Sequence, residues 1–193
     1  ARTKQAKGLN FDYLSRFLDT EQPTAWGLRN KAMLSLGYDL LSRRSELVAL
    51  RTEDIEFRAD GTLRVLVRRS KSDPFGEGRL AFTSKRTAGL VDNWLEWRGT
   101  HIKNLFCPIY HGKALDRDLS TSTVKQVIKS AAKRDGLEPS IVDKFSGHSL
   151  RVGAAQDLLR NGFDTAAIMR AGGWKSVNTL SRYLEKAEHN VWA

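Results

Sequence analysis

The stretch GHSLRVGAAQDLLRNG, residues 147–162, decides the fold because it combines a helical pattern with a cluster of positive charge. Its apolar residues recur at helical spacing and Gly162 ends the pattern, so we expect a helix from His148 to Asn161. His148 and Arg151 stand three residues apart on the first turn and therefore share a face. Cations oppose the helix dipole there, whereas the free backbone N–H groups favour an anion. The stretch therefore predicts that a negatively charged group binds at this helix end.

Further helices follow from the same apolar spacing elsewhere in the chain. Asn10 is the predicted N-cap of the first, and Ser45 opens a short helix within SELVALRTEDI, residues 45–55. The other predicted helices span residues 11–20, 25–42, 87–98, 120–135, 165–171 and 177–186. Residues 1–10 are basic and polar without any period, so we expect a linker or arm there.

One part of the chain follows a strand pattern instead. Leu63, Val65 and Val67 alternate with other residues, and the RLAF segment at 79–82 is the predicted partner strand. Pro and Gly residues between the two segments supply the turn. The predicted fold class is therefore mostly α with a small antiparallel β-hairpin or sheet, an α+β domain.

The charge balance points to a polyanionic partner. The chain of 193 residues has 32 Lys and Arg against 22 Asp and Glu, a formal net charge of +10. Basic domains attract polyanions, of which nucleic acid is the commonest. A basic domain without such a partner is the alternative that charge alone leaves open.

Several classes of protein are disfavoured by composition. Cys107 is the single cysteine and cannot form an internal disulfide, which suits a reducing cytosol. The four histidines show no metal-ligand spacing, so we expect no metal and no cofactor. No apolar run is long enough to span a bilayer, and no signal-peptide pattern opens the chain. We expect a cytoplasmic, DNA-associated protein without membrane contact.

Other residues, like His148 and Arg151, are candidates for binding an anion. Arg43 and Glu46 lie where two helices join, Lys71 lies near the hairpin tip, Trp174 follows two glycines, and Tyr183 lies on the last helix. Each has an ordinary structural explanation: Tyr183 and Trp174 as core aromatics, His148 as a capped core histidine, Arg43 as a helix C-terminal cation and Lys71 as a solvated charge. The functional alternative is that all of these side chains converge on a single anion.

Five motifs in this order resemble the tyrosine recombinase (phage integrase) family. They are R-x-S-E-L at 43–47, the lysine in RRSKSD at 68–73, GHSLRVGAA at 147–155, AGGW at 171–174 and RYL at 182–184. The resemblance covers nearly the whole chain and implies a catalytic domain over residues 11–193. Family members carry an N-terminal DNA-clasping domain, and nothing in this chain corresponds to it.

The resemblance also implies a role for each residue. Tyr183 matches the nucleophile that attacks a DNA phosphodiester, forming a 3′-phosphotyrosyl bond and freeing a 5′-hydroxyl. Arg43 and Arg151 match the arginines that hold the scissile phosphate, and His148 matches the histidine of the H-x-x-R motif. Lys71 matches the lysine that protonates the leaving oxygen. Trp174 occupies a His or Trp position, and Glu46 matches a supporting carboxylate.

The chemistry of these residue types agrees with those roles. A tyrosine with a pKa of about 10 is only about 0.1% ionised at neutral pH, so it needs cations or a base to act as a nucleophile. Two guanidiniums offer paired planar donors to the oxygens of a phosphoryl transition state. No metal is needed for that step.

The resemblance implies a site-specific recombinase that cuts and rejoins double-stranded DNA and assembles on it, as a tetramer of the full-length protein. Two alternatives stay open. A type IB topoisomerase-like enzyme uses nearly the same chemistry to relax DNA without pairing two sites. A catalytically inactive DNA-binding module needs only the basic charge and the helices.

Overall fold

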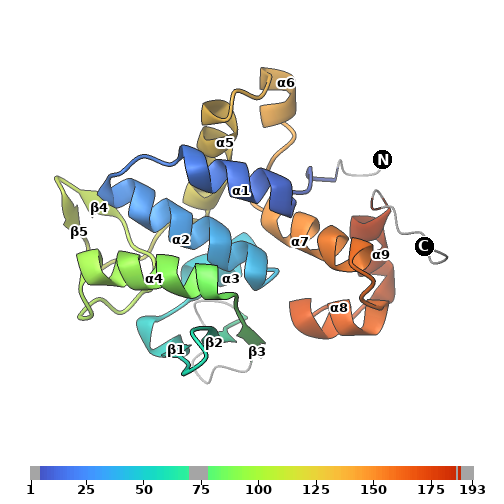
Figure 1. Ribbon diagram of the computed structural model, residues 1–193, viewed down its shortest axis with the longest axis horizontal. Coiled ribbons are helices and arrows are strands. Elements are labelled where there is room, and N and C mark those ends of the chain that lie inside the picture. Colours follow the sequence, from blue (N-terminus) through green and yellow to red (C-terminus); the bar gives the residue numbers. More distant parts are fainter. Residues whose placement is uncertain (1–4, 70–77, 186, 188–193) are drawn as a thin grey trace.

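The computed structural model describes residues 5–69, 78–185 and 187. Helices make up most of it, and short strands form small antiparallel sheets (Figure 1), so the predicted fold class is confirmed. The helices are α1 Phe11–Thr20, α2 Ala25–Asp39, α3 Arg44–Ala49, α4 Lys85–Arg98, α5 Thr121–Arg134, α6 Pro139–Val142, α7 Ser149–Arg160, α8 Thr165–Gly172 and α9 Val177–Leu184. The strands are β1 Ile55–Phe57, β2 Leu63–Val67, β3 Arg79–Phe82, β4 Ile109–Tyr110 and β5 Lys113–Ala114.

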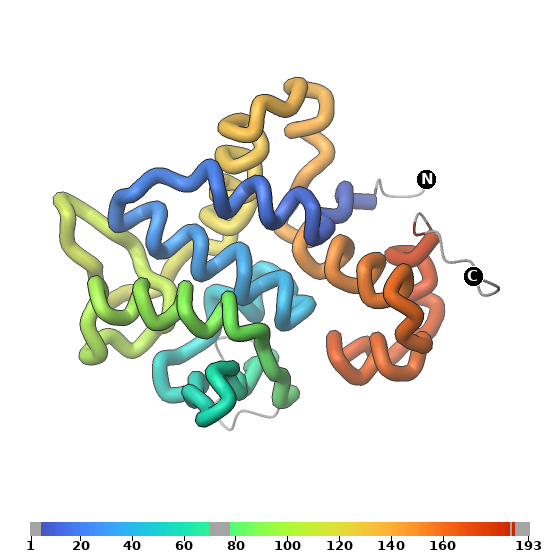
Figure 2. The backbone as a smooth tube through the Cα atoms, in the orientation of Figure 1, coloured from blue at the N-terminus to red at the C-terminus, as the bar shows by residue number. Residues whose placement is uncertain are grey.

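Helix α2 lies at the centre of the main core and packs against α1, α4 and α7, as the backbone trace in Figure 2 shows. It ends at Asp39 rather than at Ser42, because Leu41 adopts a positive φ of 50° and turns the chain into α3. Helix α3 then begins at Arg44, with Arg43 and not Ser45 as its N-cap residue. This tight turn determines the position from which the Arg43 side chain projects.

The sheet has the order β1-β2-β3, so the predicted hairpin is two strands of a three-stranded sheet. Strand β1 has three residues, too few to show an alternating pattern. In β3, Leu80 and Phe82 are about half exposed, at 52% and 53%. Arg79 pairs with the buried Val67 and therefore shares its face of the sheet. A cation thus occupies an inward position, and the two large apolar residues of β3 face outward.

Helices α8 and α9 lie beside α7 (Figure 1) and attach to it through a small core of their own. Its buried members are Leu41, Ala154, Ala155, Ile168, Trp174 and Leu180. Helix α7 begins at Ser149 with His148 as N-cap residue, one residue from the predicted start. This second core holds the last helix, which carries Tyr183, against the turn that carries Leu41.

Residues 5–10 form no helix or strand but run along α7. The backbone N–H of Leu9 donates to the Ser149 carbonyl at 2.8 Å, and the Leu9 side chain is fully buried. A Cβ on Gly153 would lie 2.0 Å from the Leu9 carbonyl oxygen, which explains the glycine inside α7. In the part of the chain that the structure describes, no helix is both long and apolar enough to cross a membrane.

Candidate active site

Arg43 and Glu46 are held by the first turn of α3. The Glu46 carboxylate accepts the backbone N–H of Arg43 at 2.8 Å and its Nη1 at 3.4 Å. The Glu46 side chain is almost fully buried, whereas that of Arg43 is 43% exposed. A carboxylate at the third position of a helix caps its N-terminus, and here the capping pair is Arg43 with Glu46 instead of the predicted start at Ser45.

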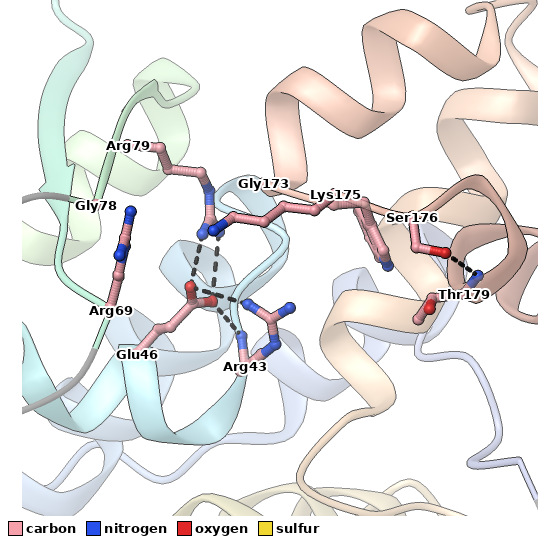
Figure 3. A pocket seen from close by; sticks show the side chains of 10 residues that line it. Arg43, Glu46, Arg69, Gly78, Arg79, Gly173, Lys175, Ser176 and Thr179 are labelled. Carbon is pink, nitrogen blue, oxygen red and sulfur yellow. Dashed lines mark hydrogen bonds and ion pairs between the residues drawn. The ribbon is translucent and has the colours of Figure 1, made fainter.

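Arg79 is a residue that the sequence analysis missed. Its Nη1 lies 2.6 Å from Oε2 of Glu46, so one buried carboxylate pairs with two arginines (Figure 3). The strand pattern identified RLAF as a partner strand but did not indicate which of its side chains face inward. The register with Val67 was the signal that could have identified Arg79 as inward-facing.

These three residues line a cavity of about 500 Å³ between the sheet, α3 and the turn before α9 (Figure 3). Its lining residues are Arg43, Glu46, Arg69, Gly78, Arg79, Gly173, Trp174, Lys175, Ser176 and Thr179. Four of them carry positive charge and one carries negative charge. The cavity is therefore suited to an anion.

Arg151 lies inward from this cavity and is only 1% exposed. Its Nη1 donates to the carbonyls of Leu41 and Gly172, both at 2.7 Å, and its guanidinium carbon lies 3.5 Å from the centroid of the Trp174 ring. The Nη2 of Arg151 and the Nε1 of Trp174 are buried without a hydrogen-bond partner among the described residues. Buried donors normally have acceptors, so both groups are suited to bind an incoming oxygen.

Burial is the main cause that lowers the pKa of Arg151 to about 9, and the neighbouring Arg43 and Arg79 contribute to this lowering. Glu46 and Tyr183 act in the opposite direction and raise it. The site thus holds more buried positive charge than its carboxylate balances. A bound phosphate would correct that imbalance, because charge-assisted bonds to guanidinium are strong.

Tyr183 is half-buried on α9 and contacts Trp174, with ring centroids 5.8 Å apart and planes tilted by 63°. Gln156 of α7 donates to the Tyr183 backbone carbonyl at 3.0 Å. Trp174 therefore lies in contact with both Arg151 and Tyr183. It packs in the second core, as the structural explanation expects, and its Nε1 has no hydrogen-bond partner among the described residues, as the functional explanation requires.

His148, at the start of α7, is only partly covered by protein, whereas Arg151 is fully buried. Together with Tyr183 it lines a second cavity, of about 470 Å³, whose other cations are Lys125, Lys129, Lys144 and Arg182. Partial burial lowers the pKa of His148, and the guanidiniums of Arg44, Arg151 and Arg43 lower it further. The neutral ring that results can accept a proton.

The structure thus places five of the seven predicted residues in two cavities that share Thr179, and a sixth in contact with one of the five. Arg43, Glu46 and Trp174 line the first, His148 and Tyr183 line the second, and Arg151 contacts Trp174 between them. Lys71 lies outside the described residues. Within the described ranges, no group of three or more His, Cys, Asp or Glu residues could hold a metal ion.

The family model described as the phage integrase family matches residues 7–190. The chain belongs to the phage integrase family. The match confirms the family that the five motifs indicated, and it covers nearly the whole chain.

Individual members of this family are similar to the chain in sequence and in fold. An integrase/recombinase XerD homolog of Selenomonas ruminantium is 32% identical over 167 residues, 83% of this chain and 48% of the relative. Recombinase Cre of Escherichia phage P1 is 27% identical over 208 residues, 100% of this chain and 60% of the relative. The crystal structure of the XerH site-specific recombinase bound to its difH substrate, a post-cleavage complex, superposes with a TM-score of 0.74 at 22% identity.

That superposition covers 96% of this chain and 51% of the XerH chain. The chain thus spans about half to six tenths of the length of these three proteins. At such identity the superposition shows the fold alone, which is that of tyrosine recombinase catalytic domains.

Proposed function

We propose that this chain is the catalytic domain of a site-specific recombinase that cuts and rejoins double-stranded DNA through a 3′-phosphotyrosyl intermediate. The observation that carries the proposal is the stack of Arg151, Trp174 and Tyr183, in which two unpaired buried donors lie next to a phenol. Family membership and the net charge of +10 support the same conclusion.

The reaction follows from the chemistry of these side chains. The Oη of Tyr183 attacks the scissile phosphorus, a new O–P bond forms, and the bond from phosphorus to the 5′-oxygen breaks. His148 accepts the phenol proton, for which its lowered pKa suits it. Lys71 donates a proton to the departing 5′-oxygen, which leaves as a hydroxyl. Rejoining reverses these transfers, and the phosphotyrosyl bond conserves the free energy of the broken linkage.

Arg43 and Arg151 stabilise the charge that builds on the non-bridging oxygens of the transition state. Removing one such donor typically raises the barrier by about 3 to 4 kcal/mol. Glu46 acts on Arg43 rather than on the phosphate, because a carboxylate would repel the phosphate oxygens. Trp174 donates its Nε1–H to one of these oxygens.

The proposed nucleophile is tested by covalent capture. The protein is incubated with a pool of randomised DNA duplexes that carry a nick, and SDS-stable protein–DNA adducts are collected and sequenced. We expect an adduct on a defined set of duplexes, and none with Tyr183→Phe although duplex binding persists. Tyr110→Phe, on the exposed strand β4, is the matched control and retains the adduct.

The other outcomes contradict the proposal in different ways. An adduct that persists in Tyr183→Phe removes the nucleophile assignment. Binding without an adduct on any duplex favours an inactive DNA-binding module. Relaxation of supercoiled plasmids of any sequence favours a type IB topoisomerase-like activity.

We also infer that the full-length protein acts as a tetramer on DNA. Exchange of strands between two duplexes requires four strand cuts, and each cut consumes one Tyr183. The mass of the complex that holds two duplexes, measured by sedimentation, should correspond to four protein chains, and a mass corresponding to two would contradict the inference.

A further inference from the structure

Arg79 connects three parts of the fold that are distant in sequence. From strand β3, its Nη1 contacts Oε2 of Glu46 at 2.6 Å, its Nη2 donates to the Leu40 carbonyl at 2.8 Å, and its Nε donates to the Ala171 carbonyl at 3.3 Å. Its side chain is 14% exposed. Every nitrogen of this guanidinium thus has a partner, which indicates a structural fork and not a free anion ligand.

Arg151 makes a parallel set of contacts with the same two turns. It donates to the carbonyls of Leu41 and Gly172, which directly follow the two carbonyls that Arg79 binds. Two guanidiniums therefore bridge residues 40–41 and residues 171–172. We call this arrangement the carbonyl clamp.

The two clamped turns are those from which the site residues project. Leu41 has a positive φ of 50° two residues before Arg43, and Gly173 has a φ of 69° directly before Trp174. A non-glycine residue in this backbone region is strained, so surrounding contacts must hold it. The carbonyl clamp supplies such contacts, and it couples the position of Arg43 to that of Trp174.

Arg79 also determines how Glu46 divides its charge. The bond from Glu46 to Arg79 is 2.6 Å long, whereas its bond to the Arg43 side chain is 3.4 Å long. The shorter bond is the stronger. Without Arg79, Arg43 would be the remaining cation for this buried carboxylate, and its guanidinium would be drawn onto Glu46.

We propose that Arg79 is a positioning residue for strand cleavage: by neutralising Glu46 and clamping the Trp174 turn, it leaves Arg43 available to the phosphate. This inference rests on the proposed function. It assigns Arg79 no contact with the DNA.

The first test compares Arg79→Met and Arg79→Lys with Arg64→Met. Arg64 lies on the neighbouring strand β2 and has a partly exposed pair with Glu56 only, so it is a matched control. Cleavage is followed in a single turnover at saturating protein, on duplexes that the wild-type protein cleaves. We expect Arg79→Met to slow cleavage about a hundredfold, because a misplacement of about 1 Å has an effect of that size. DNA affinity should stay within about threefold of wild type.

Arg79→Lys restores the charge but cannot make the three-way contact, so we expect it to remain slowed by about tenfold. If Arg79→Met fails to fold, as its melting curve would reveal, Arg79→Lys carries the test. Arg64→Met should cleave at the wild-type rate. Wild-type cleavage by both Arg79 variants would overturn the proposal.

A second test asks whether Arg79 acts through Glu46. In a Glu46→Gln background no charge remains to capture Arg43, so the additional slowing by Arg79→Met should shrink to about the tenfold that loss of the carbonyl contacts causes. An undiminished hundredfold slowing in that background would show that Arg79 does not act through Glu46, and this part of the proposal would be wrong.

A readout without DNA separates this inference from the proposed function. In protein labelled with ¹⁵N-arginine, the Nε–H resonance of Arg43 should move in Arg79→Met and return toward its wild-type position in the double variant with Glu46→Gln. An unmoved resonance contradicts the inference, whether or not the wild-type protein forms an adduct. A moved resonance without any wild-type adduct contradicts the proposed function alone.

Discussion

Arg151 illustrates how one side chain serves both the fold and the site. One nitrogen of its guanidinium binds two backbone carbonyls, and another has no partner among the described residues. The planar fork of arginine makes this division possible, whereas a lysine offers a single charged nitrogen. The H-x-x-R spacing predicted a phosphate ligand, and the structure adds that the same residue holds two turns together.

His148 leads to a prediction about pH. Burial and three guanidiniums lower its pKa below the ordinary value of 6.5, so the neutral ring that accepts a proton persists in mildly acidic solution. The cleavage rate should therefore fall only as the pH drops through this lowered pKa, below 6.5. Arg44→Gln removes one of the cations and should move the acidic limb of the rate profile to higher pH.

The measurement is the single-turnover rate of adduct formation from about pH 5 to 8, the range in which histidine titrates. Arg44→Lys keeps the charge and serves as the control, with an acidic limb close to that of wild type. A limb that stays in place in Arg44→Gln, or a wild-type limb above pH 6.5, would show that His148 is not the base.

Helix α7 packs against residues 5–10 and also carries Arg151 of the site. The backbones of α7 and residues 5–10 approach closely at Gly153. An added Cβ would meet the Leu9 carbonyl oxygen, so Gly153→Ala should lower the free energy of unfolding by about 1 to 3 kcal/mol, the usual effect of overpacking. Thermal or urea unfolding measures this change.

Gly89 in α4 provides the matched control, because an added Cβ there meets nothing within 4 Å. Gly89→Ala should raise the free energy of unfolding by about 0.4 to 1 kcal/mol, since alanine restricts the unfolded chain and favours helix. Equal effects of the two substitutions would mean that residues 5–10 do not pack on α7 in solution.

For the molecule as a whole, charge governs affinity for DNA. Lys125 is exposed and lines the cavity that contains Tyr183, whereas Lys113 of β5 lies at the opposite end of the molecule from α9 (Figure 1). Lys125→Gln should reduce the slope of log affinity against log salt concentration by about one unit, because one phosphate contact is lost. Lys113→Gln should leave the slope unchanged. Binding isotherms at several salt concentrations test both, and equal slopes for the two variants would place the DNA elsewhere.

Local patterns predicted much of this fold correctly. Helices α1, α5 and α7 follow from apolar spacing, α1 also from its cap Asn10, and the pairing of β2 with β3 follows from alternation and turn residues. The motifs also pointed to Arg43, Glu46, His148, Arg151, Trp174 and Tyr183 as residues of the proposed site, because their order along the chain is characteristic of the family. The helices and the hairpin depend on residues that lie near one another in the chain, where local spacing determines the structure.

Other features exist only because distant segments meet. The bond from Arg151 to the Leu41 carbonyl joins residues 110 positions apart, and the contact of Arg79 with Ala171 joins residues 92 apart. No periodic pattern encodes such pairs, and nothing in the RLAF segment indicated that Arg79 faces inward. The sequence alone therefore indicated the family and, through its motifs, the residues of the proposed site. The inward place of Arg79, the carbonyl clamp and the division of the site into two cavities arise from packing, because long-range contacts outweigh local preference once the core forms.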